Sequence, residues 1–323
     1  MVDITPSTLT AEQIELRRSG IGSSEVAAAN GICSFRSPHD LWLEKTERVE
    51  RDFADNPRVE FGNRLEPVVA EKYREEHGID PRCLRKCTTI VHPAREWMLD
   101  TCDYAIYDQA DANRPDAKPI RLLEIKTSGY YSQWGDEHTD DVPSQYIAQC
   151  QWHCEVWNVD VCDLAVLLSG FMYKEYTIQR NQELIDKLIY NAEKLWYDYI
   201  RKDIEPPLDD SDGCRTMLGM KYPTHDDVID IASQSGESLA AELRDLNDQI
   251  RGLTSRKKMI TNQLLDEIGS RRGIEGEFGT LTWTERKGSV SWKAVAAEMN
   301  PPAEVIERNR KDSYRVLNTR GLH

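Results

Sequence analysis

The most informative run of the chain is Leu122-Leu123-Glu124-Ile125-Lys126-Thr127, in which apolar and charged residues alternate. Successive side chains of a strand point to opposite faces, so Glu124 and Lys126 should share one face while Leu123, Ile125 and Thr127 share the other. The run therefore predicts a strand that presents a carboxylate and an ammonium group together on one side.

A second strand-like run, residues 97–107, lies upstream and contains Asp103. The intervening segment, Asp108 to Pro119, is rich in Asp, Asn and Pro and predicts a loop between neighbouring strands. Such a hairpin would bring Asp103 beside Glu124. Asp100 is a second candidate for this position, but it lies three residues earlier and would face the opposite side of a regular strand.

Two acids and one lysine at the end of a hairpin match the needs of phosphodiester hydrolysis. That reaction requires a cation at the scissile phosphate, a positioned water and a group that orients or deprotonates the water. Asp103, Glu124 and the backbone carbonyl of Ile125 offer the hard oxygen ligands that Mg²⁺ or Mn²⁺ prefers, and Lys126 could hold the water. A solvated charge pair between Glu124 and Lys126 is the alternative that this short motif leaves open.

Three further segments accompany this core, and the first is Arg17–Ala27. Gly22-Ser23-Ser24 followed by an Ala-rich run and Asn30-Gly31 predicts a short capped helix. The free N–H groups at such a helix start attract phosphate, although the same pattern also occurs without a ligand.

The second and third segments each predict a helix that carries a polar residue able to face the site. Glu60–Pro67 leads into Val68–Tyr73, and Pro67 should kink this helix or start a fresh one next to Glu66. An exposed first-turn glutamate is the simpler alternative for Glu66. In Pro143–Trp152, Tyr146 and Gln149 are three residues apart and share a face. Gln151 could take the place of Gln149.

In this order, the four segments resemble the lambda exonuclease and YqaJ-type viral recombinase family of the PD-(D/E)XK nuclease superfamily, over about residues 17–207. The resemblance implies an α/β fold with a restriction-endonuclease-like PD-(D/E)XK core, in which helices flank a central mixed sheet. It also implies that Arg18 and Ser24 contact the 5′ phosphate of DNA, that Glu66 approaches the metals, and that Gln149 and Tyr146 help to position the reactants. The family's Pro-Asp-Gly is Cys102-Asp103-Tyr104 here, which predicts a more extended local backbone.

The same resemblance implies Mg²⁺-dependent degradation of one strand of linear double-stranded DNA from its 5′ end. The 3′ overhang would serve a single-strand annealing protein in phage recombination, and members of the family often form homo-oligomeric rings. A related endonuclease, a nuclease of the CRISPR-adaptation type and an inactive DNA-binding or scaffold protein are the alternatives.

Composition bounds the class of protein. A chain of 323 residues with 39% hydrophobic content predicts one large or two modest folded domains. The sequence has neither a basic segment followed by an apolar stretch at its start nor eighteen consecutive apolar residues, which predicts a cytoplasmic protein with no membrane contact. The family resemblance implies that this cytoplasm is that of a bacterium or a phage-infected host. The net charge of −15 argues against non-specific coating of DNA, yet it is compatible with a local basic channel.

Eight cysteines raise the question of a metal cluster. Neither Cys83 and Cys87 near His92 nor the group of Cys150, His153 and Cys154 has convincing zinc spacing. The late cysteine trio of iron–sulfur relatives is missing, because only Cys214 follows Cys162. We therefore expect free, partly buried thiols.

The sequence predicts three parts: a nuclease domain over residues 1–207, an acidic Pro- and Gly-containing linker or strap over residues 208–235, and a helix–hairpin appendage over residues 236–323. Leu184–Ile200 predicts the last helix of the first part, before Glu205-Pro206-Pro207 interrupts regular structure. Within the strap, some apolar side chains could dock back: Met217, Leu218, Met220 and Tyr222.

In the third part, apolar residues alternate at spacings of four and three, with Lys257 at one of these positions: Leu239, Leu243, Leu246, Ile250, Leu253, Ile260 and Leu264. This pattern predicts a long helix over residues 238–268 with a coiled-coil seam, whose partner could be another subunit, the strap or the nuclease body. Phe278–Arg286 and Ser289–Lys293, joined by Lys287-Gly288, predict a hairpin with Trp283 and Trp292 on one face. A basic tail follows, in which we expect either contacts to DNA or a partner, or a solvated helix face: Arg308, Arg310, Lys311, Arg315 and Arg320.

Overall fold

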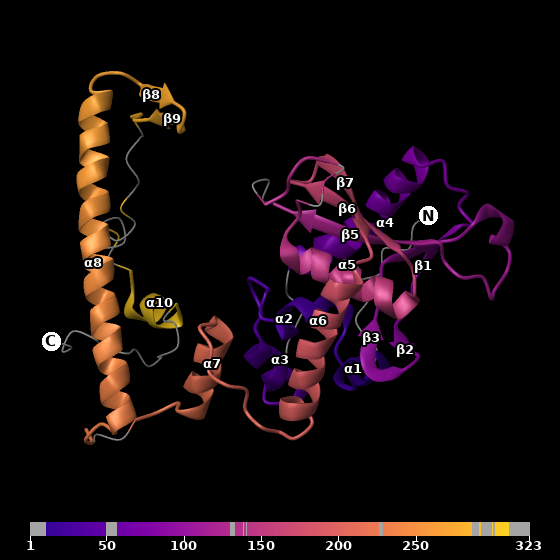
Figure 1. Cartoon of the computed structure of the whole chain (residues 1–323), viewed down its shortest axis with the longest axis horizontal. Helices are drawn as coiled ribbons and strands as arrows, with labels where there is room; N and C mark the ends of the chain where they lie inside the picture. The colour runs from indigo at the N-terminus through magenta and orange to yellow at the C-terminus, as the bar shows by residue number, and fades with distance from the viewer. Residues whose placement is uncertain are drawn as a thin grey trace. The chain divides into compact units, whose positions relative to one another are not determined.

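The computed structural model describes residues 11–49, 57–129, 133–137, 139, 141–225, 229–285, 291, 299 and 301–309. Its contacts divide the chain into two units, Met1–Lys221 and Tyr222–His323, and each is described by itself (Figure 1). Within the described part of the chain, no helix is both long enough and apolar enough to cross a membrane. The eight cysteines are all unpaired thiols.

The first unit is built on a five-stranded sheet in the order β1-β4-β5-β6-β7. The strands are β1 (Leu84–Lys86), β4 (Tyr104–Ile106), β5 (Arg121–Ser128), β6 (Val161–Leu168) and β7 (Met172–Gln179). β5 and β6 are parallel, whereas every other neighbouring pair is antiparallel. The sheet is therefore mixed, as the sequence predicted.

β5 is the central strand, and its two faces support two different helices. Leu123 and Ile125 pack with Val69 and Tyr73 of α4 (Pro57–Glu76). Leu122 lies in a separate cluster with the buried thiols of α5 (Ser144–Trp157). Figure 1 shows α4 and α5 on opposite sides of the sheet. The predicted alternation along β5 is therefore confirmed, and it places Glu124 on the face that α5 covers.

The run over residues 97–107 is not one strand. β3 (Arg95–Asp100) pairs with β2 (Ile90–His92) in a separate two-stranded sheet, and the chain leaves the strand conformation before β4 begins. The break arises because Asp100 is fully buried and bonds to side chains of α5 rather than to the five-stranded sheet. The predicted hairpin is confirmed for β4 and β5, which pair Tyr104 with Leu123.

The segment that contains Arg18 and Ser24 is docked onto β3. α1 (Ala11–Arg18) is followed by Ile21, whose N–H donates to the Trp97 carbonyl and whose carbonyl accepts from the Leu99 N–H, at 2.7 and 3.0 Å. Gly20 is required at this contact because a Cβ atom there would lie 2.2 Å from the Trp97 carbonyl oxygen.

The short capped helix predicted after this segment differs in its cap. A 3₁₀ turn, η1 (Ser23–Glu25), precedes α2 (Val26–Ala29), and Gly22 is the N-cap without a side-chain cap of its own. Glu25 takes the capping role because its Oε2 accepts from the Gly22 N–H at 2.9 Å. α3 (Pro38–Lys45) then supplies Lys45, which binds the same carboxylate at 2.8 Å.

α4 continues through Pro67, so the predicted fresh start at this residue is wrong. The proline leaves the carbonyl of Asn63 without its helical partner, but Asn63 is exposed and water can serve it.

The end of the first unit extends past residue 207. α6 (Gln182–Lys194) and the π-helical turn η3 (Leu195–Ile200) match the predicted last helix. The segment predicted as a linker then forms α7 (Asp212–Lys221), which packs against α3 through the buried side chains of Cys214 and Met217. Leu218 packs against the same hydrophobic cluster, while Met220 and Tyr222 are about half exposed.

The second unit contains α8 (Gln234–Ile268), which confirms the predicted long helix and starts at the N-cap Ser233. β8 (Gly273–Gly276) and β9 (Gly279–Thr282) form a hairpin that turns at Glu277 and Phe278, and the sequence did not predict this turn. The predicted strand Ser289–Lys293 lies mostly outside the described residues, as does the tail beyond Asn309. Arg308 ends α10 (Ala303–Arg308) and is exposed.

Candidate active site

Glu124 is the centre of the site, and its buried carboxylate accepts three side-chain hydrogen bonds. Oε1 accepts from Lys126 Nζ at 2.5 Å and from Gln149 Nε2 at 2.7 Å, while Oε2 lies 3.1 Å from His153 Nε2. Burial alone would raise the pKa of Glu124, but the charges of Lys126 and His153 lower it to about 2. The side chain is therefore a fixed anion.

Lys126 lies on the same face of β5 as Glu124, as the alternation predicted. Its burial acts to lower its pKa, but Glu124 and Asp103 raise it above its usual range. The ammonium group also lies 5.5 Å from the ring centroid of Tyr146, which stacks in turn on Trp134. Lys126 thus lies between two acids, Glu124 and Asp103, and an aromatic wall that consists of Tyr146 and Trp134.

Asp103 enters the site just before β4, and its Oδ2 accepts from the Ile125 N–H at 2.7 Å. Burial raises its pKa well above the usual range, and the nearby charges of Glu124 and Glu66 act in the same direction. Asp103 therefore lies where a further positive charge would be favourable. This hydrogen bond also places Asp103 next to the backbone of Ile125, whose carbonyl was predicted to bind the metal.

Glu66 approaches from α4 on the edge of this group. Its Oε1 accepts from Lys86 Nζ of β1 at 2.8 Å, and its charge acts on Asp103 and Tyr104. In the described part of the chain, Glu66, Asp103 and Glu124 do not bring three ligand atoms within 4.8 Å of one another, because Lys86 holds Glu66 and the Ile125 amide holds Asp103. The donor set still suits Mg²⁺ or Mn²⁺, because it consists of hard carboxylate oxygens with excess negative charge at Asp103.

One stripe of α5 carries all the residues that this helix contributes to the site. Tyr146, Gln149, His153 and Trp157 follow each other at spacings of three, four and four residues, so they lie on one face. Gln151 points elsewhere, because its Nε2 donates to the Gln179 carbonyl and its Oε1 accepts from the Asn181 N–H. Of the two glutamines considered, Gln149 is the one that reaches Glu124.

Arg18 and Ser24 do not contact the carboxylates. Ser24 is exposed, and the partly exposed Arg18 side chain lies 3.7 Å from Glu47. Their segment is held by Glu25, which binds Lys45 and Arg36, while Lys45 also donates to the Arg17 carbonyl. Sequence reasoning missed this anchoring role of Glu25, whose signal is a single acid in front of the Ala-rich run.

Comparisons with known proteins bear on this site. A model of the "YqaJ-like viral recombinase domain" matches residues 13–159. The "Uncharacterized protein YqaJ" of Bacillus subtilis (strain 168) is 30% identical over 261 residues, which span 78% of this chain and 76% of that protein. The chain belongs to the YqaJ-like viral recombinase family. The residues matched by the family model include all nine positions predicted for this YqaJ-type site: Arg18, Ser24, Glu66, Asp103, Glu124, Ile125, Lys126, Tyr146 and Gln149.

Solved structures with partial similarity were also found. An alkaline exonuclease, LHK-Exo from Laribacter hongkongensis, is 18% identical with a TM-score of 0.46, over 61% of this chain and 95% of that one. A phage-related exonuclease from Haemophilus somnus 129PT is 18% identical with a TM-score of 0.41, over 57% and 96% of the two chains.

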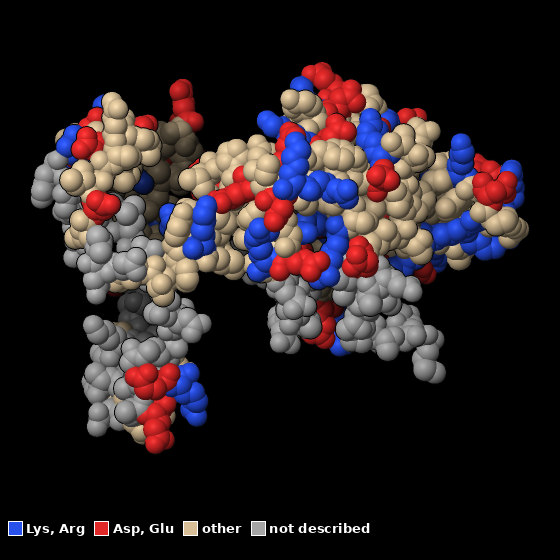
Figure 2. Space-filling model, turned by 90° about the horizontal axis from the view of Figure 1, so that it is seen from below, with Lys and Arg blue, Asp and Glu red and all other residues tan. Residues whose placement is uncertain are grey.

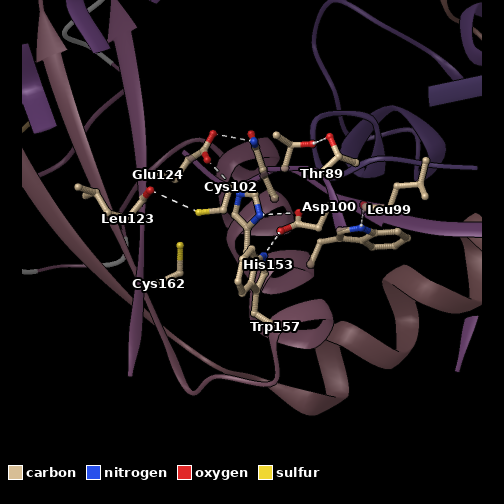
Figure 3. A network of polar contacts seen from close by, with 12 residues as sticks. Thr89, Leu99, Asp100, Cys102, Leu123, Glu124, His153, Trp157 and Cys162 are labelled. Atoms are coloured by element: carbon tan, nitrogen blue, oxygen red, sulfur yellow. Dashed lines mark hydrogen bonds and ion pairs between the residues drawn. The ribbon is translucent and has the colours of Figure 1, made fainter. Parts of the chain in front are cut away.

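The candidate site contains two groups that sequence reasoning did not place there. The sequence suggests His153 only as a zinc ligand and Asp100 only as an alternative to Asp103. His153 binds both Glu124 and Asp100, and Figure 3 shows it lying between them. The signal for His153 was available, because it follows Gln149 by four residues on the same helical face.

Charges on the surface are mixed. On the face drawn in Figure 2, basic and acidic side chains are interspersed rather than separated into one broad basic area. This face therefore offers no broad basic area for the phosphates of DNA.

Proposed function

We propose that this protein is a Mg²⁺-dependent deoxyribonuclease that degrades linear double-stranded DNA from its ends. The observation that carries the proposal is the meeting of Asp103, Glu124 and Lys126 around the middle of β5, within a chain of the YqaJ family. Mn²⁺ could replace Mg²⁺, because the same hard oxygen ligands suit both ions.

Each residue of the site has a proposed role. Asp103, Glu124 and the Ile125 carbonyl would bind the metal, and Glu66 would complete the site directly or through water. When bound, the ion would neutralise charge on the phosphate and activate water. Lys126 would orient the attacking water through its ammonium group, while Gln149 and Tyr146 would keep Glu124 and Lys126 in place.

The finer features of the proposal rest on the family. We propose 5′-to-3′ polarity, a 5′-phosphate contact by Arg18 and Ser24, and a 3′ overhang that is passed to a single-strand annealing protein. We also propose that the protein acts as a homo-oligomer in the cytoplasm of a bacterium or a phage-infected host.

The test incubates the protein and Mg²⁺ with three DNA substrates: end-labelled linear duplex, closed circular duplex and single strands. Loss of linear duplex alone supports the exonuclease, whereas cleavage of circles indicates an endonuclease. No cleavage of any substrate would leave an inactive DNA-binding protein or scaffold. Glu124→Gln and Lys126→Ala should each reduce cleavage by on the order of a hundredfold or more.

The label also tests polarity and end recognition. With 5′-labelled duplex, 5′-to-3′ degradation releases the label in the first product, whereas 3′-labelled duplex keeps its label until late. Arg18→Ala should lower the preference for 5′-phosphorylated over 5′-hydroxyl ends and leave the metal requirement unchanged.

A further inference from the structure

The side chain of His153 is fully buried, and both of its ring nitrogens are engaged by acids. Nδ1 lies 2.7 Å from Asp100 Oδ1, and Nε2 lies 3.1 Å from Glu124 Oε2. Figure 3 shows the imidazole between the two carboxylates. His153, Glu124 and Cys102 each place a ligand atom within 4.8 Å of the others. Because both ring nitrogens of His153 face carboxylate oxygens, a metal ion bound there would displace the contact to Glu124.

Asp100 is fixed from its other side. Its Oδ2 accepts from Trp157 Nε1 at 2.6 Å, so each oxygen of this buried carboxylate has a donor from α5. Asp100 belongs to β3, outside the five-stranded sheet, and it reaches Glu124 only through His153. The imidazole therefore connects the small sheet to the central strand of the large one.

We propose that Asp100 and His153 act as a positioning pair that holds the Glu124 carboxylate in the orientation needed to bind the metal. The proposal rests on the proposed nuclease function. Lys126 and Gln149 hold Oε1 of Glu124, so His153 is the group that fixes Oε2 and with it the rotation of the carboxylate plane. Hydrogen bonds that orient a metal-binding carboxylate typically change metal affinity or activity by about 10- to 100-fold.

Two substitutions of His153 test its contact to Asp100 and its contact to Glu124 separately. In His153→Asn the amide can still donate to Asp100 but no longer reaches Glu124. In His153→Gln the longer side chain can donate to Glu124 but gives up Asp100. His39→Asn is a matched control, because His39 is also fully buried with both nitrogens engaged, by Asp209 and the Pro206 carbonyl.

The primary measurement is Mn²⁺ binding to the full-length protein without DNA, followed by electron paramagnetic resonance. Thermal melting and the Mg²⁺ dependence of cleavage accompany it. We expect His153→Asn to weaken Mn²⁺ binding on the order of 10- to 100-fold and His153→Gln to weaken it less. His39→Asn should lower the melting temperature and leave the Mg²⁺ dependence of cleavage unchanged. Its Mn²⁺ binding does not serve as a control, because His39, Asp209 and Cys214 place ligand atoms within 4.8 Å of one another. Asp100→Asn should weaken binding too, and the double variant with His153→Asn should be no worse than His153→Asn alone.

The outcomes distinguish this inference from the proposed function. If the wild-type protein binds no Mn²⁺ and cuts no DNA, the nuclease function itself fails. If the wild type binds Mn²⁺ and His153→Asn binds it equally well, the positioning role is overturned while the nuclease stands. The role is also overturned if all three histidine variants change stability and the Mg²⁺ dependence of cleavage to the same extent. Recovery of cleavage by His153→Asn at high Mg²⁺ supports the role, because a merely unfolded site would not recover.

Discussion

At the level of single residues, the site depends on the balance of buried charges around Lys126. This ammonium group contacts Glu124 directly and is also favoured by Asp103. Removing it leaves two buried acids with less positive charge nearby, which favours a bound cation.

Lys126→Met should therefore bind Mn²⁺ at least as tightly as the wild type, while the rate of a single turnover falls by about a hundredfold or more. Mn²⁺ titration and quenched-flow cleavage of a labelled duplex measure the two effects. Loss of metal binding in this variant would contradict the assignment of Lys126 to the water.

Glu25 gives a prediction for pH dependence. Burial opposes its ionisation, but Lys45 and Arg36 lower its pKa below the ordinary value of 4.5. A carboxyl group whose folded pKa is lowered stabilises the protein above the unfolded pKa, and this stability is lost as the pH falls through the folded pKa.

The free energy of unfolding should therefore decrease below about pH 4.5, and Glu25→Gln should decrease less steeply over the same range. Urea unfolding at a series of pH values measures the difference between the two proteins. Parallel profiles would show that Glu25 does not contribute to acid sensitivity.

At the level of elements, the docking of residues 18–24 on β3 depends on Gly20. In Gly20→Ala the new methyl group would overlap the Trp97 carbonyl, so we expect a loss of about 1–3 kcal/mol in the free energy of unfolding. The displaced segment should also lose its preference for 5′-phosphorylated ends.

Gly219→Ala in α7 is the control, because nothing lies within 4 Å of the added Cβ atom. It should be neutral or stabilise by up to about 1 kcal/mol. Denaturant unfolding and cleavage of 5′-phosphorylated and 5′-hydroxyl duplexes test both variants. Equal end preference in Gly20→Ala and the wild type would separate this segment from DNA-end recognition.

The elements differ in how much of them the sequence could predict. The position of β5 and the direction of its side chains could be predicted, because the alternation along the strand is a local property of the sequence. The break between β3 and β4 could not, because it depends on Asp100 meeting His153, 53 residues later in the chain. The hairpin of β8 and β9 was not predicted, although Gly276 and Gly279 flank its turn, whereas the turn predicted at Lys287-Gly288 lies outside the described residues.

At the level of the whole molecule, several apolar residues of the coiled-coil seam predicted on α8 are exposed. Leu239, Leu246, Ile250 and Leu253 are 47–68% exposed. In an antiparallel pair of α8 helices, Glu242 of one copy would lie beside Arg256 of the other, and Lys257 would face Leu239 instead of a second lysine. These charges favour a second copy of the chain as the partner.

The double variant Leu246→Ser/Leu253→Ser should therefore shift the protein to a smaller oligomer in size-exclusion chromatography with light scattering. Asn262→Ser changes a residue outside the seam of the same helix and should leave the mass unchanged. If the wild type is monomeric at tens of micromolar, the seam does not mediate self-association.

The position of one helix, α5, sets the positions of four side chains in the site: Tyr146, Gln149, His153 and Trp157. A small slide or roll of this helix would move the aromatic wall, the amide and the imidazole together. The opposite side of α5 includes Ala148, which is 1% exposed and belongs to the core cluster that also contains Ile185 and Leu188. Substitutions under the helix would thus retune catalysis without altering any group that touches the reactants.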